Sequence, residues 1–306
     1  MESAEHLLTP LRVDEHSLRL DCAAHLLTRL SVCGVHLADE REIADLDFMQ
    51  DAIIPGPDYP IGPGDAGLLA PFLVDRDTPP GLCLGLGEIE LSDPAVSEIL
   101  TEATRPEFKP HYGSIHALGE FKGRLIDVLT ARPGTRTTTV IDPRIQQYSE
   151  LRQGVWVGMH YDNALNGDGV GERFPCAIRV ESADRRVLCN IGPGPRRLVL
   201  ALNLTSLHLS EKVHPGDGEN IPDTAQLHAF LRDNPAEISK IVCIVVTLKP
   251  GEYVLFPAGI AIHDGSMHEC PEVSRAIVLG GRFPRRDVFA GESIAVDAVD
   301  SVWEPA

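Results

Sequence analysis

The part of the chain from about residue 135 to residue 283 consists almost entirely of short apolar segments of the kind that form β-strands. The segments are rich in β-branched residues and are separated by turn-forming residues. They cover residues 154–161, 176–181, 185–191, 196–209, 240–248, 252–258 and 275–283. Short strands that follow one another without regularly intervening helices favour a sandwich or barrel over a parallel sheet covered by helices. We therefore predict a mainly β core with flanking helices.

The residues that precede this region have a different pattern. Residues 21–30 and two stretches between residues 92 and 131 carry apolar side chains at helical spacing. Proline and glycine interrupt residues 38–80, which we expect to form loops. The sequence thus predicts a helical and loop-rich N-terminal part, residues 1–134, that packs on the β core.

The β core is expected to span residues 135–290 and to be followed by a C-terminal tail, residues 291–306. A long polar insertion at residues 210–238 interrupts its strands and carries one helical pattern near residues 224–232. Long insertions at the rim of a β core often cover a binding site. We regard this insertion and the proline-rich loops of the N-terminal part as candidates for a lid.

The charge balance of the chain argues against a polyanionic partner. It contains 45 acidic and 27 basic residues, which gives a formal net charge of −18, and it has no run rich in lysine and arginine. Binding to nucleic acids or to an anionic membrane surface requires a basic face. We expect a small-molecule substrate, with no nucleic-acid or membrane partner, and we leave the oligomeric state open.

Cysteine usage and the N-terminal residues bear on the cellular compartment. The seven cysteines form no CxxC pair, and several lie in apolar runs where a thiol behaves as a small hydrophobic group. The first residues lack the basic and apolar regions of a secretory signal, and no apolar run reaches the roughly 18 residues that a membrane helix needs. We expect a cytoplasmic protein.

The sequence His160-Tyr161-Asp162 lies at the end of an apolar strand. In an extended segment, residues i and i+2 project from the same face, so an imidazole nitrogen of His160 and a carboxylate oxygen of Asp162 can converge on one ion. One strand end would then supply two metal ligands. Each residue also has a structural interpretation: His160 as a hydrogen-bonded histidine, and Asp162 as a turn residue in a turn-rich stretch.

A third ligand must come from elsewhere in the chain, and His263 ends an apolar segment that follows the turn Lys249-Pro250-Gly251. Two histidines and one carboxylate on one triangular face leave the opposite positions open, as in non-haem Fe(II) sites that bind an oxidant. His268 is the alternative ligand, but His263 ends the strand directly. We expect His208, at the end of another apolar segment, to be a structural histidine.

Arg275 follows His263 closely and begins a strand immediately after Ser274. A guanidinium offers two parallel donors that match a carboxylate, and it stays charged in a protein interior. Arg275 is therefore predicted to bind the far carboxylate of a dicarboxylic co-substrate, with Ser274 beside it. The remaining candidates are two arginines for this role or for an acidic substrate, and residues near the expected pocket: Arg197, Arg282, Trp156, Asn163 and Asn203. For Trp156, packing in the core is favoured over a place in the wall of the substrate pocket.

In order along the chain, the motif HYD at residues 160–162, the stretch KPGEYVLFPAGIAIH that ends at His263, and SRAIVLGGRF from Ser274 resemble the 2-oxoglutarate/Fe(II)-dependent dioxygenase family. The resemblance covers roughly residues 135–285. It implies a double-stranded β-helix, or jelly-roll (cupin-like), barrel. It also implies that iron binds to His160, Asp162 and His263, and that 2-oxoglutarate binds to Arg275.

The activity implied by this resemblance is an oxidation, most simply a hydroxylation, that uses Fe(II), 2-oxoglutarate and O2 and releases succinate. An aspartate at position 162, rather than alanine or glycine, favours hydroxylation over halogenation. The resemblance allows small substrates such as amino acids or natural-product intermediates, and the acidic composition only makes nucleic acids less attractive. The residues also fit two other functions: a cupin-type metal enzyme that does not use 2-oxoglutarate, and a non-catalytic barrel-shaped binding protein.

Overall fold

The structure is a computed structural model of the 306-residue chain. It describes residues 4–22, 24–39, 42, 53–75, 77–79, 82–88, 94, 97, 101, 146–151, 158–160, 184–215, 222–265 and 274–282. Several sequence predictions lie outside these residues. They are the greater part of the two helices expected between residues 92 and 131, most of the strand at residues 154–161, and the strand at residues 176–181.

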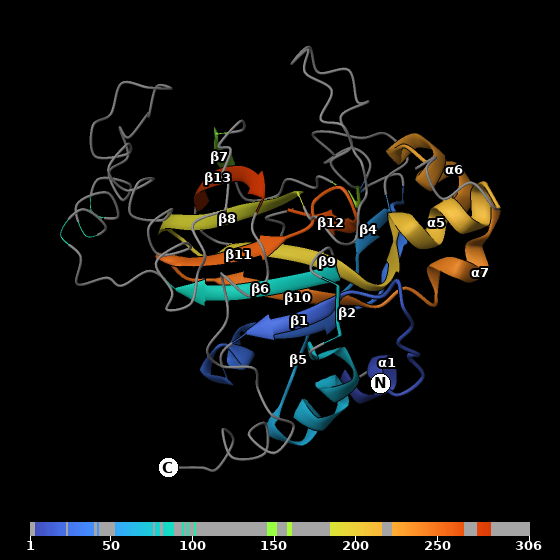
Figure 1. The fold of residues 1–306 in the computed structure, drawn as a ribbon, viewed down its shortest axis with the longest axis horizontal. Coiled ribbons are helices and arrows are strands. Elements are labelled where there is room, and N and C mark those ends of the chain that lie inside the picture. Colours follow the sequence, from blue (N-terminus) through green and yellow to red (C-terminus); the bar gives the residue numbers. More distant parts are fainter. Residues whose placement is uncertain are drawn as a thin grey trace.

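Most of the described elements are strands in two sheets whose strand pairs are mostly antiparallel (Figure 1). Sheet A has six strands, with β1 pairing in parallel with β6 and the other pairs antiparallel. Its order is β1 (Arg19–Cys22), β6 (Cys83–Glu88), β11 (Glu252–Phe256), β8 (Asp184–Pro193), β13 (Ser274–Arg282) and β7 (Gln146–Leu151). The prediction of a mainly β core is confirmed.

Sheet B has five strands, and all of its pairings are antiparallel. Its order is β12 (Ala261–Asp264), β9 (Arg196–Thr205), β10 (Cys243–Leu248), β2 (Leu30–Cys33) and β5 (Tyr59–Pro60). A third, two-stranded sheet pairs β3 (Val35–Leu37) with β4 (Ile53–Pro55). Sheet B is the one that carries His263, so its two faces matter for the site described below.

Side chains alternate between two apolar clusters along β9. Leu198, Leu200 and Leu202 belong to a large core that also contains Leu188 and Val254 of sheet A, so the two sheets pack against each other through this face. Val199 and Ala201 belong to a second cluster that includes apolar side chains of α5, α6 and α7. We call the side of each sheet that contributes to the shared core its inner face, and the opposite side its outer face.

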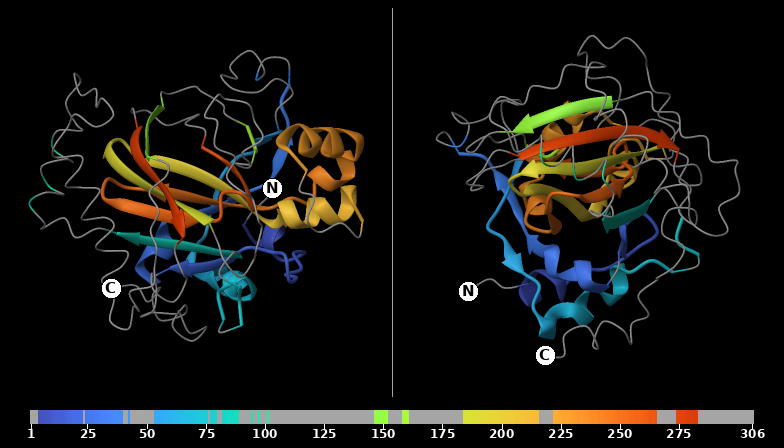
Figure 2. Two further views of the ribbon diagram at one scale, coloured as in Figure 1. Left: turned by 45° about the horizontal axis from the view of Figure 1, so that its top comes forward. Right: turned by 90° about the vertical axis from the view of Figure 1, so that its left-hand side faces the viewer.

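The helices α5 (Ser206–Val213), α6 (Thr224–Asp233) and α7 (Pro235–Ile238) gather at one end of the sheets (Figures 1 and 2). The helix predicted near residues 224–232 is confirmed, and it begins where the Asp223 carboxylate accepts a hydrogen bond from the N–H of Gln226. The strand predicted at residues 196–209 is too long, because β9 ends at Thr205 and α5 begins at Ser206.

The N-terminal residues contribute strands as well as helices. Besides α1 (Ala4–Leu8) and the 3₁₀-helices η1 (Ala24–Arg29) and η2 (Pro63–Phe72), this part supplies β1 and β6 to sheet A and β2 and β5 to sheet B. The continuous helix predicted at residues 21–30 is wrong, because these residues comprise the end of β1, η1 and the start of β2. Within the described part of the chain, no helix is both long and apolar enough to cross a membrane.

Candidate metal centre

His160 and His263 form a backbone pair at the edge of sheet B. The N–H of His160 donates to the carbonyl of His263 at 2.8 Å, and the N–H of His263 donates to the carbonyl of His160 at 2.6 Å. Two residues that exchange both hydrogen bonds lie directly opposite each other, with their side chains on the same face. Their ring centroids are 4.5 Å apart. The described residues thus bring together two of the three predicted metal ligands.

This histidine pair lies on the inner face of sheet B. His263 is in register with Leu200 of β9, which belongs to the shared core. Its ring also packs edge-on against the ring of Phe256, with centroids 5.0 Å apart. His263 is 5% exposed, and His160 is half-buried. The pair is therefore partly shielded from water by apolar side chains of both sheets.

The two rings are oriented by equivalent contacts. The Nδ1 atom of His160 lies 2.8 Å from the carbonyl oxygen of Gly158, and that of His263 lies 2.8 Å from the carbonyl oxygen of Ala261. Because a carbonyl oxygen only accepts, Nδ1 carries the proton in each neutral ring and the lone pair resides on Nε2. A histidine that binds a metal through one nitrogen commonly donates its other N–H to such a carbonyl. Both rings thus have the tautomer that a histidine needs in order to bind a metal through Nε2.

The predicted third contact to a metal lies outside the described structure. Asp162, the predicted carboxylate ligand, and His268, the alternative to His263, both lie outside the described residues. Within the residues that the structure describes, no group of three His, Cys, Asp or Glu side chains is arranged to hold a metal ion. What the geometry supports directly is the pair of histidines.

A buried carboxylate lies next to this pair. Asp264 follows His263 and is fully buried, and its Oδ2 atom accepts a hydrogen bond of 3.0 Å from the N–H of Gly158. Gly158 has a φ of 90°, in the left-handed region that glycine adopts readily and other residues do not. The short segment that bears His160 is therefore connected to β12 both by its backbone pairing and by this side chain.

Ser274 and Arg275 lie on opposite faces of β13. Ala276 belongs to the shared core, so the alternation of side chains along a strand assigns Ser274 to the inner face and Arg275 to the outer face. Arg275 is buried, and it is in register with Glu150 of β7. The Ser274 hydroxyl is fully buried and has no hydrogen-bond partner among the described residues. An unpaired buried hydroxyl is unfavourable, and a polar ligand is one group that would satisfy it.

Arg196 is a basic residue on the inner face that the sequence analysis did not single out. It precedes Leu198 by two residues on β9 and is 4% exposed. Its guanidinium lies beside the loop after β12, because a Cβ atom placed on Gly265 would be 3.5 Å from its Nη2 atom. Arg196 and His263 thus project from the same face of sheet B. The sequence signal for the inward orientation of Arg196 is its spacing of two and four residues from Leu198 and Leu200 along the same strand.

No known family model and no curated protein matches this chain. Its function must therefore be inferred from the chemistry of its own side chains.

Arg197 and Asn203, the other predicted binding residues whose side chains the structure describes, do not join the histidine pair. Arg197 is on the outer face, where its Nε and Nη2 atoms donate to the Asp58 carboxylate at 3.1 and 2.6 Å. Burial alone would lower the pKa of Arg197, but the hydrogen bond and charge of Asp58 outweigh it and raise that pKa. Asn203 bridges two backbone positions, since it donates to the carbonyl of Lys240 and accepts from the N–H of Val242. Trp156, Asn163 and the side chain of Arg282 lie outside the described structure.

Proposed function

We propose that this chain is an Fe(II)/2-oxoglutarate-dependent oxygenase that oxidises, most simply hydroxylates, a small molecule. The observation that carries the proposal is the pairing of His160 with His263, each with its Nδ1 bonded to a backbone carbonyl. Asp162 follows His160 by two positions, so a continuing extended backbone would direct its carboxylate to the same side. We propose that these three side chains bind the iron.

We further propose that the two sheets form a jelly-roll, or double-stranded β-helix. From β7 onward the chain passes repeatedly between the sheets. The segment that bears His160 bridges to β12 of sheet B, β8 returns to sheet A, β9 and β10 form a pair in sheet B, and β11, β12 and β13 alternate between A, B and A. Two antiparallel sheets that share one core and exchange successive strands are the hallmark of that fold. A site on the inner face at one edge of sheet B would open at the end of such a barrel.

The proposed co-substrate site uses the polar groups of the inner face. Arg196 offers a guanidinium on the same face of sheet B as His263, and Ser274 offers a buried hydroxyl on the inner face of sheet A. A guanidinium and a hydroxyl together match the carboxylate of 2-oxoglutarate that points away from the metal. We therefore propose Arg196 for the role that the sequence predicted for Arg275, because alternation along β13 directs Arg275 away from the shared core.

When bound, iron and 2-oxoglutarate would supply the oxidising chemistry: substrate, O2 and 2-oxoglutarate would give hydroxylated substrate, succinate and CO2. The residues of this chain would fix the geometry. His160 and His263 present Nε2 lone pairs from a rigid pair of backbone hydrogen bonds, and Phe256 limits the access of water to His263. The surrounding apolar core strengthens charge interactions within the site.

The proposal is tested by adding Fe(II) to protein purified without oxygen and then supplying 2-oxoglutarate and O2. Wild-type protein is expected to bind one equivalent of metal and to form succinate, slowly without substrate and faster with one from a panel of amino acids and their derivatives. Asp162→Ala is expected to remove metal-dependent succinate formation while the protein remains folded. Absence of metal binding by the wild type would contradict the proposal, and metal binding without succinate would indicate a metal enzyme of another kind.

The arginine assignment is tested separately with Arg196→Met and Arg275→Met, which serve as controls for each other. Loss of a charged hydrogen-bonding group is expected to raise the KM for 2-oxoglutarate about 10- to 100-fold in Arg196→Met. Arg275→Met should leave this KM close to that of the wild type. The opposite result would return the co-substrate role to Arg275.

A further inference from the structure

The outer face of sheet B carries a group of buried charges directly behind the histidine pair. Asp264 is fully buried, and Arg197, which is 9% exposed, makes its bidentate ion pair with Asp58 on the same face. The charge of Asp264, like that of Asp58, raises the pKa of Arg197, so Asp264 lies within electrostatic range of the Arg197 guanidinium. Buried charges are costly unless they are paired, so this arrangement calls for an explanation beyond packing.

We propose that Asp264 is a positioning residue for the metal centre and acts on His160 through Gly158. This inference rests on the proposed function, since it concerns how the first metal ligand is oriented. The Asp264 carboxylate accepts from the N–H of Gly158, and the carbonyl of Gly158 accepts from Nδ1 of His160. Gly158 thus donates its N–H to Asp264 and accepts, through its carbonyl oxygen, a hydrogen bond from the imidazole of His160.

The local backbone explains why a side chain is needed at this point. Met159 donates its N–H to the carbonyl of Ile53, and His160 pairs with His263, so these two residues are fixed by strand-like hydrogen bonds. Gly158 precedes them with a φ of 90°, and its N–H is directed to Asp264 instead of to a strand. Without an acceptor there, a buried N–H would lose its hydrogen bond, and the Gly158 carbonyl would be held only through the peptide unit that it shares with the Met159 N–H.

The nearby positive charge of Arg197 also offsets part of the cost of burying a carboxylate at this position. A charged acceptor makes a stronger hydrogen bond to a backbone N–H than a neutral one does. Arg197 itself is oriented by Asp58 in the loop before β5. Because Asp264 follows His263 directly, one short strand carries one ligand of the pair and orients the other.

The experiment compares Co(II) binding to wild type, Asp264→Ala and Asp264→Asn, with Glu211→Ala on the surface of α5 as the control. Outer-shell partners of metal-binding histidines typically change metal affinity 10- to 100-fold, so Asp264→Ala is expected to weaken Co(II) binding by about that factor. Asp264→Asn keeps an amide oxygen that can accept from Gly158 and is expected to restore most of the affinity. Glu211→Ala should match the wild type.

A spectroscopic measurement separates positioning from general loss of structure. In the Co(II) protein, the two exchangeable Nδ1–H protons of the ligand histidines give paramagnetically shifted NMR signals. Asp264→Asn and Asp264→Ala are expected to move one of these signals, that of His160, and to leave that of His263 in place. If Asp264→Ala does not fold, Asp264→Asn still provides this test.

The outcomes distinguish this inference from the proposed function. If the wild type binds no Co(II), the metal centre itself is wrong. If both Asp264 variants bind Co(II) as tightly as the wild type does, and their Nδ1–H signals are unchanged, the metal centre stands and the positioning role of Asp264 is refuted. An Asp264→Asn variant as impaired as Asp264→Ala would also overturn it, because the hydrogen bond to Gly158 would then not be the operative contact.

Discussion

His160 and His263 lie with their ring centroids 4.5 Å apart on the inner face of sheet B, and His16 and His208 lie 5.4 Å apart near the start of α5. The first pair bonds through Nδ1 to backbone carbonyls. In the second pair, Nδ1 of His208 accepts from the N–H of Thr205 at 3.1 Å, so Nε2 carries the proton and donates to Asp14 at 2.9 Å. Both ring nitrogens of His208 are therefore occupied by hydrogen bonds within the protein, and neither is available to bind a metal.

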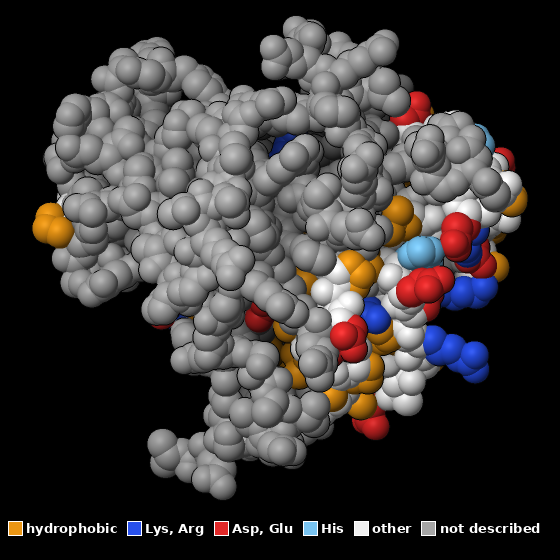
Figure 3. All heavy atoms as spheres, in the orientation of Figure 1, with side chains coloured by type: hydrophobic (Ala, Val, Ile, Leu, Met, Phe, Trp, Pro, Cys, Tyr) orange, Lys and Arg blue, Asp and Glu red, His pale blue; other side chains and the backbone are white. Residues whose placement is uncertain are grey.

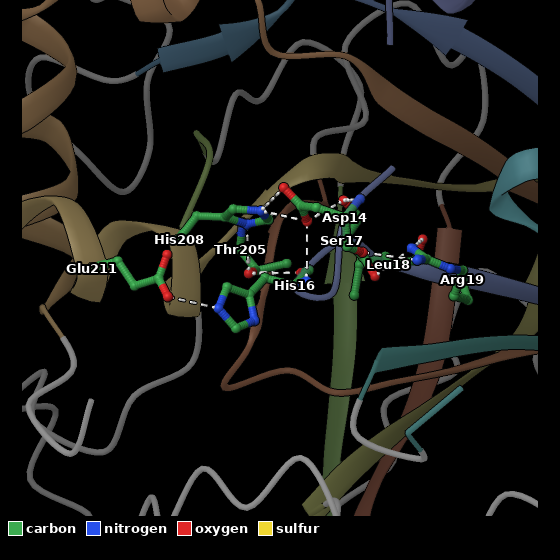
Figure 4. A network of polar contacts seen from close by, with 8 residues as sticks. All are labelled: Asp14, His16, Ser17, Leu18, Arg19, Thr205, His208 and Glu211. Atoms are coloured by element: carbon green, nitrogen blue, oxygen red, sulfur yellow. Dashed lines mark hydrogen bonds and ion pairs between the residues drawn. The ribbon is translucent and has the colours of Figure 1, made fainter. Parts of the chain in front are cut away.

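The second pair is part of a polar cluster that joins the N-terminal segment to α5 (Figure 4). We call this cluster the clasp; it consists of Asp14, His16, Ser17, Thr205, His208 and Glu211. It lies at the end of the molecule where α5 and α7 expose acidic and basic side chains (Figure 3). Two neighbouring histidines therefore do not by themselves indicate a metal site, and the partner of each nitrogen decides between a ligand and a structural contact.

The two histidine pairs are expected to differ most in how their loss affects metal binding and turnover. His160→Ala and His263→Ala each remove a proposed Nε2 ligand and are expected to lower metal-dependent succinate formation at least 100-fold, by loss of the metal. His208→Ala should retain wild-type metal affinity and turnover, because His208 lies in the clasp. Metal titration and a succinate assay on the three variants check this. Loss of metal affinity in His208→Ala would remove the distinction between the two pairs.

The sequence predicted the histidine pair because its signals are local. His160 and His263 each follow an apolar run in the sequence, and polar residues at the end of such a run can be recognised from a few neighbours. The helix at residues 224–233 was equally predictable, since its capping residue Asp223 and its amphipathic pattern lie within the segment itself. These features required no knowledge of what each segment packs against.

Other features depended on information that the local sequence does not contain. Arg196 and Arg197 are adjacent, and the strand register alone decides which of them faces the inner core. The hydrogen bond of Asp264 to Gly158 joins positions 106 residues apart. The end of β9 was missed because LTSLHL continues an apolar pattern, whereas the contact of His208 with the N–H of Thr205 starts a helix. The strands of the N-terminal part are short and find their partners far along the chain.

The clasp is expected to contribute to the stability of the fold, and two substitutions of His208 measure this contribution. His208→Ala removes the acceptor for the Thr205 N–H and the donor to Asp14, and it is expected to lower the free energy of unfolding by about 1–3 kcal/mol. His208→Gln should lose less, since a glutamine three residues after a threonine N-cap can bond back to the N-cap N–H. Urea unfolding followed by circular dichroism measures both. Equal stability of wild type and His208→Ala would show that the clasp contributes nothing to folding.

Acidification is expected to weaken the clasp through two groups. Burial lowers the pKa of His208 more than the charges of Asp14 and Glu211 raise it, and the neighbouring His16 lowers it further. Burial would raise the pKa of Asp14, but hydrogen bonds from Ser17 and His208 outweigh it and lower that pKa. For both groups the unfolded chain binds protons more readily, so stability falls as the pH drops below 6.5 for His208 and below 3.8 for Asp14.

This pH effect is measured as the difference in unfolding free energy between wild type and His208→Gln from about pH 8 to about pH 5. Wild type is expected to lose more stability over this range, because only wild type must keep the His208 imidazole neutral against a rising proton concentration. The same loss in both proteins, or a gain in wild type on acidification, would contradict a clasp that holds His208 neutral.

The smallest effect is expected for the outermost contact of the clasp. His16 bonds to Glu211 at 2.9 Å, but the Glu211 side chain is 63% exposed, so solvent and salt screen the interaction. Glu211→Gln is therefore expected to change the free energy of unfolding by less than about 0.5 kcal/mol, and this change should vanish at high salt. A loss as large as that of His208→Ala would mean that the clasp acts as one cooperative network. A large loss of stability in His208→Ala together with a small loss in Glu211→Gln would instead show that the contacts of His208 with Thr205 and Asp14 stabilise this end of β9. The contact between His16 and Glu211 would then add little.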